Sequence, residues 1–268
     1  MAVDDEGSDG DDLADLAMSD CDAAMQLLLR DFAALRLPSS VLPFVLVTQL
    51  YSVVDNRTEV DRFIAEGTAK GSLHRFRLPS SRRACALVRH EDYLGVIRAI
   101  EARLARDGEE GRSVLAAFRR RVAANAELHG LLHVDEAVLA GALESGRKTL
   151  TALSSRVLVR HNLLRPRRLG SYWLALPVPS MLLQWMRDGR EDVCKLLRKA
   201  DVGFDEAATI RLRKSKLPFV FHARDLVGRG RVDEIRTRSG RAFQLALDAP
   251  PDSDTEQGTA VGATVDVA

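Results

Sequence analysis

The sequence is poor in several residue classes that mark particular kinds of protein. Only 5% of its 268 residues are aromatic, which argues against a large β-sandwich. Its three cysteines are isolated, with no CxxC pair and no Cys/His cluster at metal-ligand spacing. No apolar run reaches about 18 residues, and the acidic start is unlike a secretory signal. We therefore expect no disulfide, metal or other cofactor, no membrane partner, and a cytosolic or nuclear protein.

The charges nearly cancel over the whole chain, but they are unevenly distributed. The chain contains 39 lysines and arginines and 38 acidic residues. Residues 1–22 and 248–268 hold nine and five acidic residues and no basic one, which leaves the middle of the chain at +15. Both ends have too little apolar content to offset the entropy of ordering, so the sequence predicts a disordered acidic tail at each end.

The longest acid-free stretch runs from Ser145 to Arg187 and contains eight lysines and arginines. Apolar spacing predicts a helix from Arg147 to His161, followed by an extended run at 163–167 and a second strand at 172–177. Helix, strand, turn and strand is the order of a winged helix. The stretch therefore predicts a recognition helix and a wing, with an anionic partner.

A similar pattern occurs three times, as the segments SSRRACALV, RLGSYWLAL and TRSGRAFQL, each after about three helical segments. The predicted strand pairs lie at 73–78 with 84–89 and at 232–238 with 241–247. Other expected helices include 43–53, 113–125 and 205–216. The predicted fold is mostly α with small β-hairpins (α+β), as three tandem winged-helix domains. Their ranges are 23–90, 91–177 and 178–247.

Nucleic-acid binding has the best physical support, because cations that neutralise phosphates release condensed counterions. We predict contacts from the recognition helix, two wings and the third unit, without strong base preference. The alternative is a protein-interaction scaffold without direct DNA contact, because arginine-rich helix faces are usually solvated. The predicted nucleic-acid-binding residues are Arg82, Arg83, Lys148, Arg156, Arg160, Arg165, Arg167, Arg168, Arg198, Lys199, Arg211, Arg213, Lys214 and Lys216.

Catalytic motifs are weak. A protein kinase needs a Gly-rich loop, a strand lysine and a DFG aspartate, and the sequence has none of them. The string from His222 to Leu226 faintly resembles HRDL, but no asparagine follows at the position of the metal ligand. His129 and His133 have helical spacing without a third ligand, so we expect no zinc there. The sequence predicts a protein that is not an enzyme and has no catalytic residues.

Several segments together resemble a known family in order and spacing. They are 49–58 with 61–62, Gly170-Ser171-Tyr172-Trp173-Leu174-Ala175-Leu176-Pro177, 198–200, His222 with 225–228, and 239–240. This pattern resembles the serine/threonine-protein kinase 19 family over about residues 24–247. The resemblance implies a nuclear protein of three winged helices, a kinase in name only, that binds double-stranded DNA. It also implies a bridging role between transcription and repair proteins in transcription-coupled nucleotide excision repair. RNA binding and a homodimer stay open.

Overall fold

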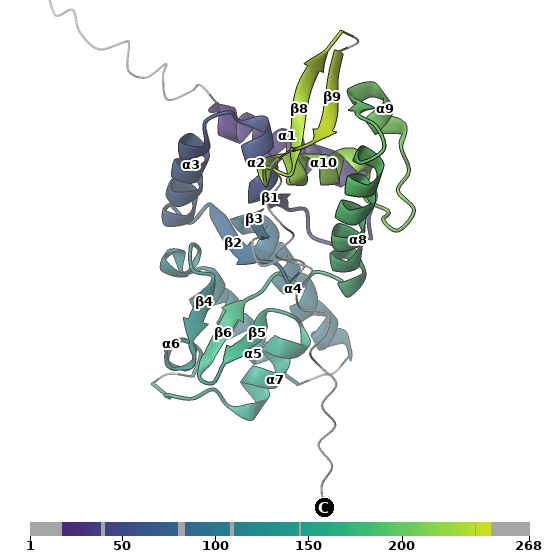
Figure 1. Cartoon of the computed structure of the whole chain (residues 1–268). Coiled ribbons are helices and arrows are strands. Elements are labelled where there is room, and N and C mark those ends of the chain that lie inside the picture. Colours follow the sequence, from purple (N-terminus) through teal and green to yellow (C-terminus); the bar gives the residue numbers. More distant parts are fainter. Residues whose placement is uncertain are drawn as a thin grey trace, which may run out of the picture.

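The computed structural model describes residues 18–38, 41–79, 84–107, 110–144, 146–238 and 240–247. The fold is mixed α/β, with helices around three small antiparallel sheets (Figure 1). The predicted acidic tail at the C-terminal end, and most of the one at the N-terminal end, lie outside the described residues. At the N-terminal end, however, residues 20–22 already belong to the first helix, so the predicted tail is too long by these three.

The first group of elements begins with α1, whose N-terminus is capped by the Ser19 side chain accepting from the backbone N–H of Asp22. Its buried face carries Met25, Leu28 and Phe32. The elements are α1 (Asp20–Ala34), β1 (Val45–Leu46), α2 (Val47–Val53), α3 (Arg57–Ala69), β2 (Leu73–Arg77) and β3 (Cys85–Arg89).

The second group follows β3 without a linker, because α4 starts at the next residue. It contains one α-helix more than each of the other groups, and also two short turns of π and 3-10 helix. The elements are α4 (His90–Asp107), α5 (Arg112–Phe118), the π-helical turn η1 (Arg119–Ala123), the 3-10 turn η2 (Ala126–Leu128), β4 (His133–Asp135), α6 (Glu136–Leu143), α7 (Ala152–Arg160), β5 (Leu164–Arg168) and β6 (Ser171–Leu174).

The third group ends in a hairpin that projects from the rest of the molecule (Figure 1). Thr237 pairs with Gly240 at its end, and Gly240 has a φ of 123°, a conformation that glycine adopts readily. The elements are α8 (Ser180–Leu197), β7 (Val202–Gly203), α9 (Phe204–Thr209), α10 (Phe219–Gly228), β8 (Val232–Thr237) and β9 (Gly240–Leu245).

All three sheets share one topology. Their strand orders are β1-β3-β2, β4-β6-β5 and β7-β9-β8, so the last strand of each group lies at the centre. Each hairpin follows a helix: α3, α7 or α10. The predicted hairpin strands are confirmed. The first strand of each sheet has only two or three residues, too few for the alternation of apolar residues that marks a strand in a sequence.

Three predicted helices are shorter than expected. The helix predicted from Arg147 starts at Ala152, and the one predicted over 205–216 ends at Thr209. The first two residues of the helix predicted at 43–53 lie outside any helix, and β1 takes the next two. The remaining residues of the three predicted helices form turns, irregular segments or, at 45–46, a strand. None of the helices in the described part of the chain combines the length and apolarity needed to cross a membrane.

The groups are packed together rather than strung out. One hydrophobic core is continuous through the first and second groups and includes Phe44, Phe76, Tyr93, Phe118 and Leu158. The third group lies against the first because α10 packs along α2, as Figure 1 shows near the centre of the upper half. The middle group occupies the opposite end of the molecule.

Candidate nucleic-acid interface

Helix α7 is fixed at its start by an unusually complete cap. The Thr151 hydroxyl accepts from the backbone N–H of Ser154 at 3.2 Å. Glu144 accepts from both the backbone N–H and the hydroxyl of Thr151 at 2.9 Å. These bonds set the first helical residue at Ala152. Lys148 is therefore exposed in the segment before the helix, which corrects its predicted place on the helix.

The two faces of α7 have opposite character. Ser154, Val157 and Leu158 are buried against the core. Arg156 and Arg160 are exposed on the outer side, as the apolar period predicts. Among the described residues, no carboxylate forms an ion pair with Arg156. This face is open to a partner.

The β5–β6 hairpin beside α7 presents further cations. Arg167 and Arg168 are exposed, while Arg165 is half-buried. The guanidinium carbon of Arg167 lies 4.9 Å from the centre of the Trp173 ring, within the range of a cation–π contact. Trp173 is itself half-buried. The predicted wing residues are thus close together in space.

Sequence reasoning missed one member of this cluster. Arg77, in β2 of the first group, lies 4.7 Å from the centre of the same Trp173 ring. Burial and the nearby cation of Arg77 lower the pKa of Arg165. We call Arg77, Arg165, Arg167 and Trp173 the Trp173 cluster. Arg77 lies outside the predicted wing tips and recognition helices, so the sequence does not mark it as a contact. Nothing in the sequence of β2 indicates that this strand adjoins β6.

The Trp173 cluster concentrates positive charge without internal neutralisation. None of the described carboxylates pairs with its three arginines. Holding like charges together is unfavourable, and a partly buried cation loses hydration as well. A bound anion such as a phosphodiester would offset both costs. The geometry therefore suits an anionic ligand that bridges the first and second groups.

The predicted residues of the third group form a separate patch along α8. Arg198 and Lys199 are exposed just after that helix. The other cations lie on a non-helical segment that runs beside α8. Its backbone N–H at Lys214 donates to Asp192 at 3.0 Å, and the Lys216 ammonium lies 5.4 Å from the centre of the Trp185 ring. Arg211, Arg213, Lys214 and Lys216 are all exposed.

The structure thus divides the predicted sites into two patches. The patch of the middle group contains Lys148, Arg156, Arg160, Arg165, Arg167 and Arg168. The other predicted binding residues that the structure describes flank α8 and α9. These two regions are well separated in Figure 1. Arg82 and Arg83 lie outside the described residues.

The kinase-like string has a structural role instead of a catalytic one. Asp225 is fully buried and accepts from Thr48 of α2, Arg190 of α8 and Arg229. Burial raises the pKa of Asp225, but these two arginines and the hydrogen bonds outweigh it and hold the pKa below its usual range. His222 is buried beside it, with Nε2 3.0 Å from the Ser215 hydroxyl. No substrate could reach these groups.

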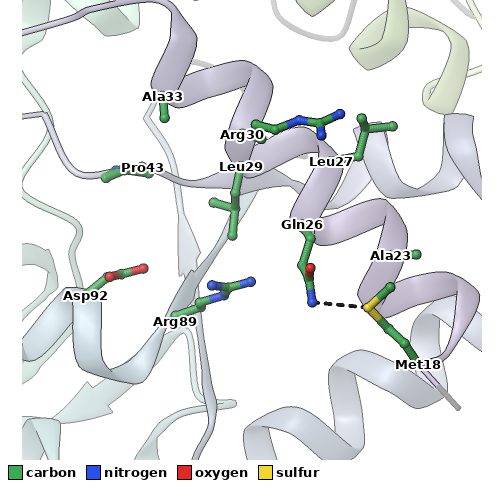
Figure 2. A pocket seen from close by; sticks show the side chains of 10 residues that line it. All are labelled: Met18, Ala23, Gln26, Leu27, Leu29, Arg30, Ala33, Pro43, Arg89 and Asp92. Carbon is green, nitrogen blue, oxygen red and sulfur yellow. Dashed lines mark hydrogen bonds between the residues drawn. The ribbon is translucent and has the colours of Figure 1, made fainter.

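The structure also has a cavity of about 640 Å³ along α1. Figure 2 shows Arg89 and Asp92 facing α1 across this space, and the Gln26 amide directed at the Met18 sulfur 3.2 Å away. Its lining includes apolar residues of α1, such as Leu27 and Leu29. The lining contains no pair of a nucleophile and a base, so its chemistry suggests no catalytic site.

Comparison with known proteins agrees with the geometry. Residues 20–216 match the family described as inactive serine-threonine protein kinase 19. The chain belongs to this family. The description of the family as inactive confirms the prediction that the protein is not an enzyme. The expected resemblance is also confirmed, although the match ends before α10.

Three curated relatives are each named "Winged helix repair factor 1". The protein of Homo sapiens is 27% identical over 230 residues, which cover 83% of this chain and 84% of the relative. That of Mus musculus is 27% identical over 210 residues, covering 76% of each chain. That of Xenopus laevis is 26% identical over 210 residues, covering 76% and 75%.

Proposed function

We propose that this protein is a non-enzymatic, DNA-binding winged-helix factor of DNA repair, acting in the nucleus. The observation that carries the proposal is the exposed basic surface of α7 and the β5–β6 hairpin, continued by Arg77 of β2. The name of the relatives supports the repair context. Bridging of transcription and repair proteins in transcription-coupled nucleotide excision repair is the finer role that we propose.

We further propose that the three groups are tandem winged-helix domains, at about 23–90, 91–177 and 178–247. The repeated strand order supports this division, as does the helix before each hairpin. In this arrangement α3, α7 and α10 take the place of recognition helices. In the described part of the chain, α7 combines two exposed arginines with the adjoining cations of the Trp173 cluster. We therefore assign the primary contact to the middle domain.

Binding in this proposal depends mainly on phosphates. The exposed side chains of the surface are arginines, and α7 carries no Asn or Gln that could read adenine. The second patch, along α8, would hold either a further length of duplex or an acidic surface of a partner protein. Its separation from α7 supports a bridging role.

The test is duplex binding measured by fluorescence anisotropy at several salt concentrations. We expect affinity to fall by at least tenfold between about 50 and 200 mM salt, because counterions are released on binding. Arg156→Glu combined with Arg167→Glu should weaken binding by at least about tenfold. It should also reduce, by about 2, the slope of the logarithm of the binding constant against the logarithm of the salt concentration. RNA and single-stranded probes establish the preference for duplex.

A matched control is Arg30→Glu combined with Arg98→Glu, on α1 and α4, which makes the same charge change at exposed positions outside both patches and outside α3, α7 and α10. Arg98 pairs with Glu91 on the surface, so its loss costs little stability. Equal loss of binding in both double variants would mean that only net charge matters. Unchanged binding in the α7 variant would favour a protein scaffold without direct DNA contact.

A further inference from the structure

Three histidines from distant parts of the sequence meet between the first and second groups. His74 lies in β2, His90 begins α4, and His129 follows η2. One ring nitrogen from each lies within 4.8 Å of the others. Their spacing of 16 and 39 residues matches no metal motif, which explains why the sequence predicts no metal centre.

The backbone holds the three rings in place. His74 pairs with Val88 across the β2–β3 ladder, so the chain returns to the same point when it reaches His90. The backbone N–H of Arg75 donates to the carbonyl of His129 at 3.0 Å. The cluster is therefore built from two chain segments that are hydrogen-bonded to the same strand.

Two of the three imidazoles, those of His74 and His129, are in surroundings that favour the neutral form. Burial, together with the neighbouring His129 and His90, lowers the pKa of His74 to about 2. Burial also lowers the pKa of His129. The Nε2 of His129 lies 2.9 Å from the Ala123 carbonyl, which fixes the proton on Nε2 and leaves the lone pair on Nδ1. Such a carbonyl partner is typical of metal-ligating histidines.

The distances are close to those of a tetrahedral site. With metal–nitrogen bonds of about 2.0–2.1 Å, ligand nitrogens lie about 3.3 Å apart and ring centres about 5 Å apart. His74 Nε2 and His90 Nδ1 are 3.0 Å apart. The ring centre of His90 lies 5.2 Å from that of His74 and 5.0 Å from that of His129. The ring centres of His74 and His129, 3.8 Å apart, must separate by about 1 Å, and ring nitrogens that lie up to 4.8 Å apart must approach to about 3.3 Å.

The cluster also has a route to solvent. His90 is half-buried and lines a cavity of about 440 Å³, together with Asp22, Lys70 and Glu91. In the proposal below, a cation would approach from this cavity and keep one water as its fourth ligand. The buried His74 and His129 lie behind His90, away from bulk water.

We propose that His74, His90 and His129 bind one divalent transition-metal ion of the zinc class. The all-imidazole ligand set favours zinc, copper or nickel over magnesium or calcium, which prefer oxygen. The ion would replace the hydrogen bond between His74 and His90. It would join β2 and the start of α4 to the turn before β4, and so stabilise the contact between the first two groups.

The test uses the full chain, freed of any polyhistidine tag and of metal, titrated with Co²⁺. We expect one equivalent to bind with the visible absorption bands of tetrahedral Co²⁺ and to be displaced by Zn²⁺. Zn²⁺ should also raise the midpoint of thermal unfolding. Absence of these cobalt bands from the unsubstituted protein overturns the proposal without any variant.

His90→Ala should weaken Co²⁺ binding by at least about tenfold. The matched control is His133→Ala, because His133 is an exposed histidine that contacts the Trp173 ring instead. Binding that survives in His90→Ala overturns the proposal. If that variant does not fold, nitrogen NMR of the unsubstituted protein decides: Zn²⁺ must shift the imidazole signals of these three histidines and not that of His133. DNA binding does not enter either readout.

Discussion

Helices α7 and α10 hold the same place in their groups, each before a hairpin, but their surroundings are opposite. Helix α7 buries one face and exposes two arginines on the other. Helix α10 is covered by α2 and α8, and its polar residues His222 and Asp225 are buried. Position before a hairpin therefore does not decide which helix keeps an exposed face. The packing of the neighbouring group decides it.

The contrast extends to how each helix uses its charges. Around α7, no described carboxylate lies within ion-pair distance of Arg156, Arg165 or Arg167. Around α10 the cations of Arg190 and Arg229 meet the carboxylate of Asp225. One arrangement leaves charge for a partner, and the other satisfies it internally. The two helices should respond differently to substitution.

The largest effect should come from breaking the buried ion pairs of α10. Asp225→Asn leaves the buried Arg190 and the half-buried Arg229 without this carboxylate and should lower the free energy of unfolding by about 3–5 kcal/mol. Urea denaturation measures it. Asp233→Asn, at an exposed position of β8, is the control and should stay within about 0.5 kcal/mol of the unsubstituted protein. A small change in the free energy of unfolding for Asp225→Asn would contradict the idea that the ion pairs of α10 hold the groups together.

A pH-dependent effect should come from His222. Burial, with the Arg190 cation, lowers its pKa to about 3 in the folded protein. The unfolded chain therefore binds more protons between pH 6.5 and pH 3, and the stability from neutral His222 is complete above about pH 6.5 and lost as the pH falls. Between pH 7 and pH 5 the loss should be about 2 kcal/mol.

The measurement compares urea midpoints of the unsubstituted protein and His222→Gln at pH 7 and pH 5. Glutamine can still bond to Ser215 but does not titrate, so the difference between the two proteins isolates His222. Parallel pH dependence in both proteins would exclude His222 as the source.

On α7, loss of the cap should have a smaller effect. Thr151→Ala removes the hydroxyl that accepts from Ser154 and donates to Glu144, and should cost about 1 kcal/mol. Hydrogen exchange should show faster exchange at the first turn of α7. Thr151→Ser keeps the hydroxyl and should restore protection. Faster exchange in α10 as well would mean that the two helices are not energetically separate.

The smallest effect should come from the surface of α10. Arg224 pairs with Asp31 of α1 at 2.8 Å, but Asp31 is about half exposed. Arg224→Ala should therefore cost less than about 1 kcal/mol, and high salt should weaken the pair further. The urea midpoint measures this. A loss as large as that of Asp225→Asn would remove the distinction between the surface and the buried pairs of α10.

The sequence predicts features that depend on local periodicity. The hairpins around β5–β6 and β8–β9 and the exposed side of α7 follow from apolar spacing and turn residues. The sequence predicts the start of α7 at Arg147, too early, because Arg147 and Lys148 are good helix formers. The actual start is set by the cap at Thr151, which depends on Glu144. A cap of this kind is visible only when the preceding loop is known.

Features that depend on contacts between distant segments could not be predicted. Arg77 reaches Trp173 because β2 packs near β6, and Asp225 meets Thr48 across 177 positions of sequence. The three histidines likewise converge through the β2–β3 register. Residue spacing carries no information on such meetings, since it does not determine how the groups pack.

The packing of α10 on α2 has a consequence for synthesis of the chain. Gly228 lies so close that an added Cβ would meet the Thr48 carbonyl oxygen, and Gln49 donates to the Phe221 carbonyl. A growing chain can complete this contact only after nearly all of it has left the ribosome. A fragment that ends at residue 216 would lack α10 and leave the surface of α2 that it covers in water. Such a fragment would aggregate more readily than the full chain.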